Sequence, residues 1–137
     1  MEDCVFCKIV SGDIPSYKVY EDDHVLAFLD LTQGTKGHTL VIPKHHVKNI
    51  YELDQSTATQ VFTAVPKVAK ALKDAFSPIG LNVVQNNDKP LQSVFHFHVH
   101  LLPRYENDGM VLRTLNLQDD LEQEDYQNIQ AAIKKAL

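Results

Sequence analysis

The pattern of apolar and polar residues changes several times along the chain, and each change marks a predicted element. Two short runs of β-favouring residues, 18–21 and 25–30, bracket the acidic turn Asp22-Asp23. Residues 38–43 predict a third strand, which follows a loop that contains two glycines. Because these strands follow one another so closely, we expect them to form an antiparallel meander.

A long helix is predicted next, because apolar residues recur every three or four positions between residues 61 and 76. Asp54 is a suitable N-cap for this helix. Pro66 lies inside the apolar pattern, so we expect it to kink the helix or to shift its start. The sequence Ser-Pro-Ile-Gly at 77–80 ends the helix.

The second half of the chain predicts two more strands and a last helix. Residues 81–85 form one strand, and residues 95–102 form another that is stopped by Pro103. Residues 122–136 place apolar side chains on one face of a helix. The order of elements predicts an α+β fold, with a five-stranded, mainly antiparallel sheet, one central helix and a C-terminal helix. We expect residues 1–137 to form a single domain.

Composition and charge narrow the functional classes. The chain has 137 residues, of which 44% are apolar, and a net charge of -5 at pH 7. This charge argues against a broad nucleic-acid surface, which needs clustered lysine and arginine, but it permits one phosphate group to be bound locally. No apolar run approaches the ~20 residues that span a bilayer, and the acidic N-terminus does not resemble a signal peptide. We therefore expect a cytoplasmic protein without a membrane partner.

Three of the seven histidines alternate with apolar residues between positions 95 and 102. In a strand, His96, His98 and His100 would share one face, with neighbouring imidazoles roughly 7 Å apart. A phosphate or a metal ion could bridge two rings at that spacing. Solvated strand faces are usually built from other polar residues, so the pattern favours a metal site or a nucleophilic histidine over an ordinary polar surface. The opposite face, which we expect to meet the core, consists of Phe95, Phe97, Val99 and Leu101.

The two cysteines, Cys4 and Cys7, are separated by two residues. This spacing supplies half of a tetrahedral zinc site, whereas cysteines so close in sequence make a poor structural disulfide. A redox pair would open a helix after a strand, and the sequence predicts no strand before Cys4. Two ordinary thiols are the alternative.

The histidine pattern, with Gln-Ser-Val before it at 92–94, resembles the signature of the histidine-triad (HIT) family, in the Hint-like branch that hydrolyses purine nucleoside phosphoramidates. Further matches are Phe-Cys-Lys-Ile at 6–9, Ala-Phe-Leu-Asp at 27–30 and Gly-His-Thr-Leu-Val-Ile-Pro-Lys at 37–44. The resemblance covers residues 4–104, and residues 105–137 look like the C-terminal helical extension of a bacterial-type member. It implies the HIT-like fold and a homodimer.

The resemblance also assigns the chemistry. His98 matches the family's nucleophile, which forms a nucleotidyl-histidine, and His100 would contact the phosphate oxygens. Ser93 and Gln92 would help the leaving group and the developing charge. A nucleophilic imidazole must be neutral, and a carbonyl that accepts its other N–H would aim it. No metal is required for this chemistry.

A nucleotide pocket follows from the same resemblance. Asp30 matches an acid that accepts hydrogen bonds from both ribose hydroxyls. Asn86 matches an asparagine near the phosphates, although residues 87–91 lack the family's glycines, so Asn87 is an alternative match. The apolar walls around the base would be Val5, Phe6, Ile9 and Leu31. The implied partner is a purine nucleotide, a derivative of AMP or GMP.

Some family members complete a zinc site with two histidines that correspond to His46 and His96 here. The implied zinc would be structural, with Cys4 and Cys7 as the other ligands. The predicted activity is hydrolysis of purine nucleoside phosphoramidates or related nucleoside 5′-phosphate derivatives, with nucleotidyl transfer through His98. The alternatives are dinucleoside polyphosphate hydrolysis, a nucleotide-binding or sensing module with weak catalysis, and a metal-binding protein in which all three histidines of the triad are ligands.

Overall fold

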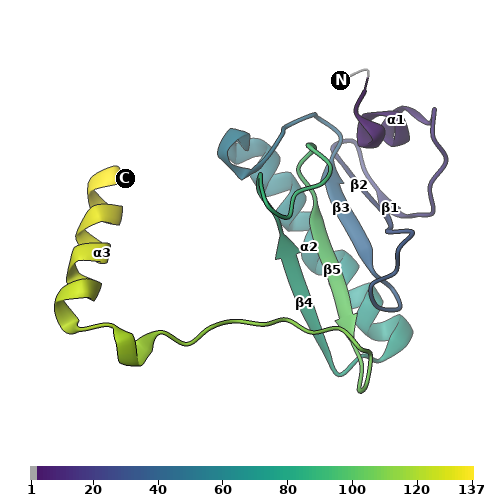
Figure 1. Cartoon of the computed structure of the whole chain (residues 1–137). Coiled ribbons are helices and arrows are strands. Elements are labelled where there is room, and N and C mark those ends of the chain that lie inside the picture. Colours follow the sequence, from purple (N-terminus) through teal and green to yellow (C-terminus); the bar gives the residue numbers. More distant parts are fainter. Residues whose placement is uncertain (1–2) are drawn as a thin grey trace.

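A five-stranded antiparallel sheet in the order β1-β2-β3-β5-β4 forms the centre of the computed structural model, which describes residues 3–137. Helix α2 covers one face of the sheet and helix α1 packs against the other (Figure 1). The strands are β1 (Lys18–Glu21), β2 (Val25–Leu29), β3 (Thr39–Pro43), β4 (Gly80–Gln85) and β5 (Val99–Arg104). The helices are α1 (Val5–Ser11), α2 (Gln55–Phe76) and α3 (Gln123–Ala136), with short 3₁₀ turns at Ile50–Glu52 and Gln118–Asp120. The predicted α+β fold and the meander of β1, β2 and β3 are confirmed.

The core has two layers, one on each face of the sheet. Val25 and Ala27 of β2 pack in the layer that contains α2. Leu26 and Phe28 pack in the layer that contains α1. Because both faces are covered, four successive residues of β2 are buried, and the strand shows no alternation of apolar and polar residues.

Helix α2 begins directly after Asp54, whose carboxylate accepts a hydrogen bond from the backbone N–H of Thr57 at 2.7 Å. The predicted N-cap is therefore confirmed. Pro66 does not shift the start of the helix, because α2 continues through it from Gln55 to Phe76. Pro66 is exposed to solvent, so water can bond to the carbonyl four residues earlier that lacks a backbone partner.

The histidine strand starts later and ends later than predicted, since β5 runs from Val99 to Arg104. Residues 95–98 approach the sheet without pairing with another strand of the described chain, and the N–H of Phe97 donates to the carbonyl of Val47 at 2.7 Å. The prediction that Pro103 stops the strand is wrong. Strand β3 pairs with β5 only as far as Leu101, so no β3 hydrogen bond is lost at the proline.

The predicted division of β5 into two faces holds from residue 97 onward. Phe97, Val99 and Leu101 are all fully buried in the layer against α2. Phe95 is 46% exposed, so its predicted place in the core is wrong. It precedes the paired part of the strand, and the ammonium group of Lys48 lies 5.4 Å from the centre of its ring.

Helix α1 is an element that the sequence analysis does not predict. The sulfur of Cys4 accepts a hydrogen bond from the backbone N–H of Cys7 at 3.3 Å and caps the helix, and Gly12 ends it in the left-handed conformation with φ 87°. Phe6 and Ile9 are its buried residues. With only 7 residues, the helix is too short to show an apolar period in the sequence.

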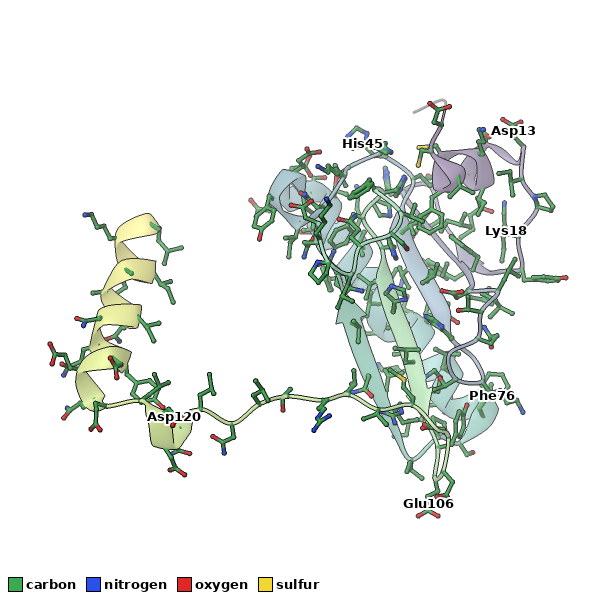
Figure 2. The ribbon with its side chains drawn as sticks, in the orientation of Figure 1. Asp13, Lys18, His45, Phe76, Glu106 and Asp120 are labelled. Carbon is green, nitrogen blue, oxygen red and sulfur yellow. The ribbon has the colours of Figure 1, made fainter. Side chains whose placement is uncertain are left out.

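The C-terminal helix lies apart from the rest of the chain. Residues 105–122 lead from the end of β5 past β4, and α3 stands away from the sheet (Figure 1). The predicted helix is confirmed, and its capping box includes a hydrogen bond from the N–H of Glu122 to Asp125 at 2.8 Å. The helix stands clear of the body, with side chains on all sides of it (Figure 2), and the described part of the chain buries none of them. Within residues 3–137, no helix combines the length and apolar character needed to cross a membrane.

Candidate active site

The three histidines of the sequence pattern divide between two environments. His98 and His100 lie together, with their ring centroids 4.9 Å apart. This is closer than the roughly 7 Å expected from strand geometry alone, because the two rings lean toward each other. His96 is fully buried, and its ring faces Cys4 and Cys7. The pattern therefore supplies two side chains to one site and one side chain to another.

His98 is held as a neutral imidazole with one free ring nitrogen. Its Nδ1–H donates to the backbone carbonyl of His96 at 2.7 Å, and because a carbonyl only accepts, the proton lies on Nδ1. Burial lowers the pKa of His98 below its usual value and keeps the ring uncharged at neutral pH. The lone pair on Nε2 is then available, as a nucleophilic imidazole requires. Phe6 packs edge-on against the ring, with centroids 5.1 Å apart.

A fourth histidine, His38, fixes the protonation of His100. The backbone N–H of Gly34 donates to Nδ1 of His38 at 3.1 Å, so the proton of His38 lies on Nε2. That nitrogen is 2.9 Å from Nδ1 of His100 and donates to it. The proton of His100 therefore lies on Nε2, where it can donate to an anion. Burial, followed by the neighbouring His98 and His38, lowers the pKa of His100 to about 4.

The sequence analysis does not single out His38 as a functional residue. It lies 62 positions before His100 and directly before an apolar strand, so it looks like a strand start. The antiparallel pairing of β3 with β5, which sets Leu40 opposite His100, brings the two rings together. The match to the histidine-triad family at residues 37–44 is the signal that could have identified it.

Asp30 follows the end of β2 and reaches the same cluster. Its Oδ1 accepts hydrogen bonds from the backbone N–H and the hydroxyl of Thr32, at 2.8 and 2.7 Å. Its Oδ2 lies 3.5 Å from Nε2 of His38. Partial burial alone would raise the pKa of Asp30, but the Thr32 hydrogen bonds and the nearby histidines lower it below its usual value. The carboxylate is therefore ionised at neutral pH, and Oδ2 is the oxygen left for a ligand.

Asp30, His98 and His100 line a cavity of about 710 Å³ on the α1 face of the sheet, which is within the size range of small-molecule sites. The cavity brings together eight of the residues that the sequence analysis proposed: Val5, Phe6, Ile9, Asp30, Leu31, Ser93, His98 and His100. The segment 14–17, which the sequence analysis does not propose, forms another part of the wall. Leu31 and Tyr17 are 80% and 67% exposed, so two large side chains of apolar character lie at the outer part of the cavity lining.

Gln92 lies outside the lining of this cavity. Its amide NH₂ donates to the backbone carbonyls of Lys48 and Val94, at 2.7 and 3.1 Å. Its amide oxygen accepts a hydrogen bond from the backbone N–H of Asp88 at 2.7 Å. The buried side chain thus fixes the loop that ends in Ser93, which is exposed and does line the cavity.

The two candidate asparagines also lie outside the lining of the described cavity. The side-chain oxygen of Asn87 accepts hydrogen bonds from the N–H of Ile50 and the amide of Gln85, both at 2.8 Å. The backbone carbonyl of Asn86 accepts a hydrogen bond from Gln85 at 3.1 Å. Asn87 therefore organises the turn after β4, and a phosphate contact by Asn86 stays a prediction.

Cys4, Cys7, His46 and His96 form a second cluster, with one ligand atom from each residue within 4.8 Å of the others. The Nε2–H of His96 donates to the carbonyl of Pro43 at 2.7 Å, so its Nδ1 lone pair faces the sulfurs of Cys4 and Cys7 at 3.4 and 3.6 Å. Nδ1 of His46 lies 3.3 Å from the sulfur of Cys7. Two sulfurs and two imidazole nitrogens are a donor set that zinc prefers, and a carbonyl that orients a ligand histidine is typical of such sites. These residues therefore fit a structural zinc ion.

Asp30, His38 and His100 form another close group of potential metal ligands. The backbone N–H of Gly34 already occupies Nδ1 of His38, so Nε2 carries a proton and offers no lone pair to a metal. His98 belongs to neither group of potential ligands in the described chain. The interpretation in which all three histidines of the triad bind metal is therefore not supported by the geometry.

The fold, the paired His98 and His100 and the carboxylate beside them define a protein of the histidine-triad type. The HIT domain family matches residues 11–107 of this chain. The chain is 57% identical over 138 residues to "Protein hit" of Bacillus subtilis, and the aligned region covers 99% of this chain and 95% of the relative. A crystal structure of a HIT family member from B. subtilis aligns with a TM-score of 0.96, covering 98% of this chain and 97% of the other. The chain belongs to the HIT family.

Other relatives have more specific names. The adenosine 5′-monophosphoramidase hnt1 of Schizosaccharomyces pombe is 44% identical over 102 residues, 74% of each chain. The adenylylsulfatase HINT3 of Arabidopsis thaliana is 39% identical over 107 residues, 77% of this chain and 54% of the relative. A zinc-bound histidine triad family protein from Mycobacterium smegmatis is 33% identical, with a TM-score of 0.76 over 96% of this chain and 98% of the other. The HIT family thus includes hydrolases and a zinc-bound member.

Proposed function

We propose that this chain is a nucleotide-binding hydrolase and nucleotidyl transferase that acts on purine nucleoside phosphoramidates or related nucleoside 5′-phosphate derivatives. The observation that carries the proposal is the hydrogen bond from Nδ1–H of His98 to the carbonyl of His96, which leaves Nε2 as a neutral nucleophile beside the cavity. The relatives named as a phosphoramidase and an adenylylsulfatase support this substrate class.

The reaction has two steps. The lone pair of His98 Nε2 forms a bond to the α-phosphorus, and the bond to the leaving group breaks with its electron pair. The carbonyl of His96 stabilises the imidazolium that results. The exposed hydroxyl of Ser93 gives a proton to the leaving amine and takes up another proton from solvent. Water then attacks the phosphorus, the phosphorus–nitrogen bond to His98 breaks, a proton passes to solvent, and the nucleoside monophosphate leaves.

Charge on the phosphate is stabilised by His100. Its Nε2–H donates to a phosphoryl oxygen, where negative charge develops as the nucleophile attacks. His38 keeps that proton in place by donating to the other ring nitrogen of His100. Gln92 contributes indirectly, because its three backbone hydrogen bonds hold the loop that carries Ser93.

Nucleoside recognition uses other side chains that line the same cavity. Oδ2 of Asp30 accepts a hydrogen bond from the ribose, because Thr32 already occupies the other carboxylate oxygen. The purine lies among apolar side chains that α1 and the end of β2 contribute, namely Val5, Phe6, Ile9 and Leu31. An apolar slot of this kind accepts a flat ring but contains few groups that would distinguish adenine from guanine.

Space for a larger leaving group beside Ser93 suggests a second candidate function. A neighbouring cavity of about 350 Å³ shares Val5, Ser93 and Val94 with the nucleotide cavity. A leaving group placed there can be larger than a simple amine. Hydrolysis of dinucleoside polyphosphates, with the same His98 and a nucleotide as leaving group, is therefore the second candidate.

Zinc, when bound by Cys4, Cys7, His46 and His96, would act as a structural cross-link. Cys4 and Cys7 belong to the start of α1, whereas His46 and His96 precede and follow α2 in the chain. The cross-link would fix α1, which supplies Phe6 to the nucleotide cavity. The zinc-bound relative from M. smegmatis supports this assignment.

The test is turnover of a panel of adenosine and guanosine phosphoramidates and dinucleoside polyphosphates by the wild type and by His98→Ala. We expect phosphoramidates to be hydrolysed fastest and His98→Ala to lose turnover while still binding nucleoside monophosphate. His24→Ala is the matched control, because His24 is exposed at the turn between β1 and β2. Turnover by His98→Ala within a few-fold of wild type would rule out the proposed nucleophile, and a chain that binds nucleotide without turnover would favour a sensing role.

A further inference from the structure

The two cysteines belong to the element that forms part of the wall of the nucleotide cavity. Cys4 caps α1, and Cys7 lies in the first turn of the helix. Val5 and Phe6, which stand between the cysteines in the sequence, and Ile9 all line the cavity. A change in the bonds of the two sulfurs therefore acts directly on this wall.

Helix α1 is too short to be stable alone, so its position depends on contacts with the sheet. It has 7 residues, and an isolated helix of that length does not persist in water. Its buried residues are Phe6 and Ile9. The ring of Phe6 packs edge-on against the rings of Phe28 and His98, with centroids 5.4 and 5.1 Å apart. Two buried side chains are a small anchor, so an additional tether has a large effect on how firmly the helix is held.

The sulfurs of the two cysteines provide that additional tether through the proposed zinc site. The sulfur of Cys4 lies 3.4 Å from Nδ1 of His96, and the sulfur of Cys7 lies 3.3 Å from Nδ1 of His46. His46 follows β3 and His96 precedes β5, and these two strands are neighbours in the sheet. Because the ligands come from three segments of the chain, a shared zinc ion holds the start of α1 against the sheet. The tether is lost when the sulfurs stop being ligands.

The same two sulfurs are placed to form a disulfide with each other. They lie within 4.8 Å of one another, and the N–H of Cys7 donates to the sulfur of Cys4 at 3.3 Å. Side chains three positions apart in a helical turn are neighbours, so rotation of the two side chains brings the sulfurs to bonding distance. Both cysteines are partly exposed, and Cys4 lines the smaller cavity beside Ser93, where a small oxidant can enter.

Oxidation of this pair by hydrogen peroxide balances without a further reactant. Both sulfurs are thiolates when they bind zinc, and the thiolate is the reactive form of cysteine. One thiolate attacks a peroxide oxygen, the O–O bond breaks, hydroxide leaves and a sulfenic acid forms. The other thiolate attacks that sulfur, the disulfide bond forms and a second hydroxide leaves. The two sulfurs thus lose two electrons, which reduce the peroxide, and the zinc ion loses both of its sulfur ligands.

We propose that Cys4 and Cys7 form a redox-sensitive pair, whose oxidation to a disulfide releases zinc, loosens α1 and weakens nucleotide binding. A loosened α1 takes Phe6 and its neighbours out of the wall that packs on the nucleotide. The hydrogen bond from His98 to the backbone carbonyl of His96 does not involve α1 and stays in place. Oxidation should therefore raise the Kd for a nucleotide and change kcat little. The inference rests on the zinc site of the proposed function and is independent of the chemistry of His98.

The first measurement follows zinc, the disulfide and AMP binding together. Reduced, zinc-loaded wild type is titrated with hydrogen peroxide, zinc release is followed with a chromogenic chelator, and the denatured chain is weighed by mass spectrometry. We expect about one zinc ion to be released for each chain that loses the mass of two hydrogen atoms. The Kd for AMP, measured by calorimetry, should rise at least about fivefold, as it does when α1 is docked in about a fifth of the molecules. A thiol reductant with added zinc should restore the affinity.

The matched control is Cys4→Ser with Cys7→Ser. The chain contains two cysteines, so this variant has no thiol left to oxidise, and it still contains both methionines. We expect it to bind AMP about as weakly as the oxidised wild type and to show no change when peroxide is added. An affinity equal to that of the reduced wild type would overturn the proposal, because α1 would not need the tether. A loss of affinity on peroxide treatment as large as in the wild type would also overturn it, because other side chains would then be responsible.

The second measurement uses the wild-type chain and so does not depend on how a variant folds. Amide hydrogen exchange is compared in the reduced, zinc-loaded protein and in the oxidised protein. Exchange should become at least about tenfold faster in α1 and stay unchanged in α2 and β5. His98→Ala should show the same zinc release and the same change in α1, so the result is separate from the test of the nucleophile. A reduced chain without zinc, an oxidised chain that keeps its zinc, or unchanged AMP affinity and α1 exchange after oxidation would overturn the proposal.

Discussion

Asp30 gives a sharp test of the nucleotide site, because Thr32 occupies one of its carboxylate oxygens and leaves the other for a ligand. In Asp30→Asn, the amide oxygen must face the two donors of Thr32. The amide NH₂ then faces the ribose and the N–H of His38, which lies 3.5 Å from Oδ2 in the wild type. A ribose hydroxyl loses a charged acceptor and meets a donor. Losing a hydrogen bond to a charged group costs about 1.5–3 kcal/mol, which is about 10- to 150-fold in kcat/KM.

The assay compares kcat/KM for an adenosine phosphoramidate and for its 2′,3′-dideoxy analogue. Asp30→Asn should show the full loss on the ribonucleotide but should stay within about threefold of wild type on the dideoxy substrate, which has no hydroxyls to lose. Asp22→Asn is the matched control. Asp22 accepts hydrogen bonds from the N–H groups of His24 and Val25 in the turn between β1 and β2, outside the cavity, so both substrates should be unaffected.

Equal losses on the two substrates would refute the ribose contact. They would show that Asp30 acts through the geometry of His38 and His100, and that another group holds the ribose. A loss from Asp22→Asn as large as that from Asp30→Asn would attribute the effect to weakened turns in general.

Further predictions concern the zinc cluster and the paired imidazoles. Protein prepared without added metal should contain about one zinc per chain, and Cys4→Ser should lower Tm by several degrees while kcat changes little; a metal-free wild type of unchanged Tm would contradict a structural zinc. His38→Leu should lower kcat about 10- to 100-fold with little change in KM, and His38→Gln, whose amide N–H can still donate to His100, should recover part of it. Equal kcat for these two variants would exclude control of the His100 tautomer by His38. Because burial lowers the pKa of His100 to about 4 from 6.5, the unfolded state takes up the proton first as pH falls, so the free energy of unfolding should decrease from pH 6.5 toward pH 4. Urea unfolding should show that the free energy of unfolding is lower at pH 5 than at pH 7, with up to about 1 kcal/mol of the difference due to His100 after allowance for its partial exposure. The variant His100→Gln should lose this part of the pH dependence. An unchanged pH dependence in the variant would contradict the lowered pKa of His100.

Most of the sheet and its central helix could be predicted from the sequence, because local signals determined them. Strand β1 has the predicted bounds, because the carboxylate of Asp22 fixes the turn after it by accepting hydrogen bonds from the N–H groups of His24 and Val25. Helix α2 starts where Asp54 caps it. Strand β5 was harder to place, because its two ends are set by its pairing with β4, which places Gln85 opposite Val99 and Gly80 opposite Arg104, rather than by its own residues. Helix α1 was missed because a cysteine caps it and its buried face consists of only two residues.

The candidate site could be predicted only as far as the segments that match the family extend. The motif identifies His98 and His100, and the structure places both beside one cavity. The role of His38 depends on the pairing of two strands that are distant in sequence, and only the family match at residues 37–44 points to this residue. The hydrogen bonds of Gln92 to three backbone groups likewise follow from how one loop packs on another, so the sequence alone could not show that this side chain is turned away from the cavity.

The most direct test of the central claim is to trap the covalent intermediate. Wild-type protein is mixed with an adenosine phosphoramidate, quenched under mildly alkaline denaturing conditions that preserve a phosphorus–nitrogen bond, and analysed by mass spectrometry of the intact chain and its peptides. We predict an increase in mass by one adenylyl group, located on His98 and missing from His98→Ala. An adduct on another residue, or steady turnover by His98→Ala without any adduct, would contradict nucleotidyl transfer through His98.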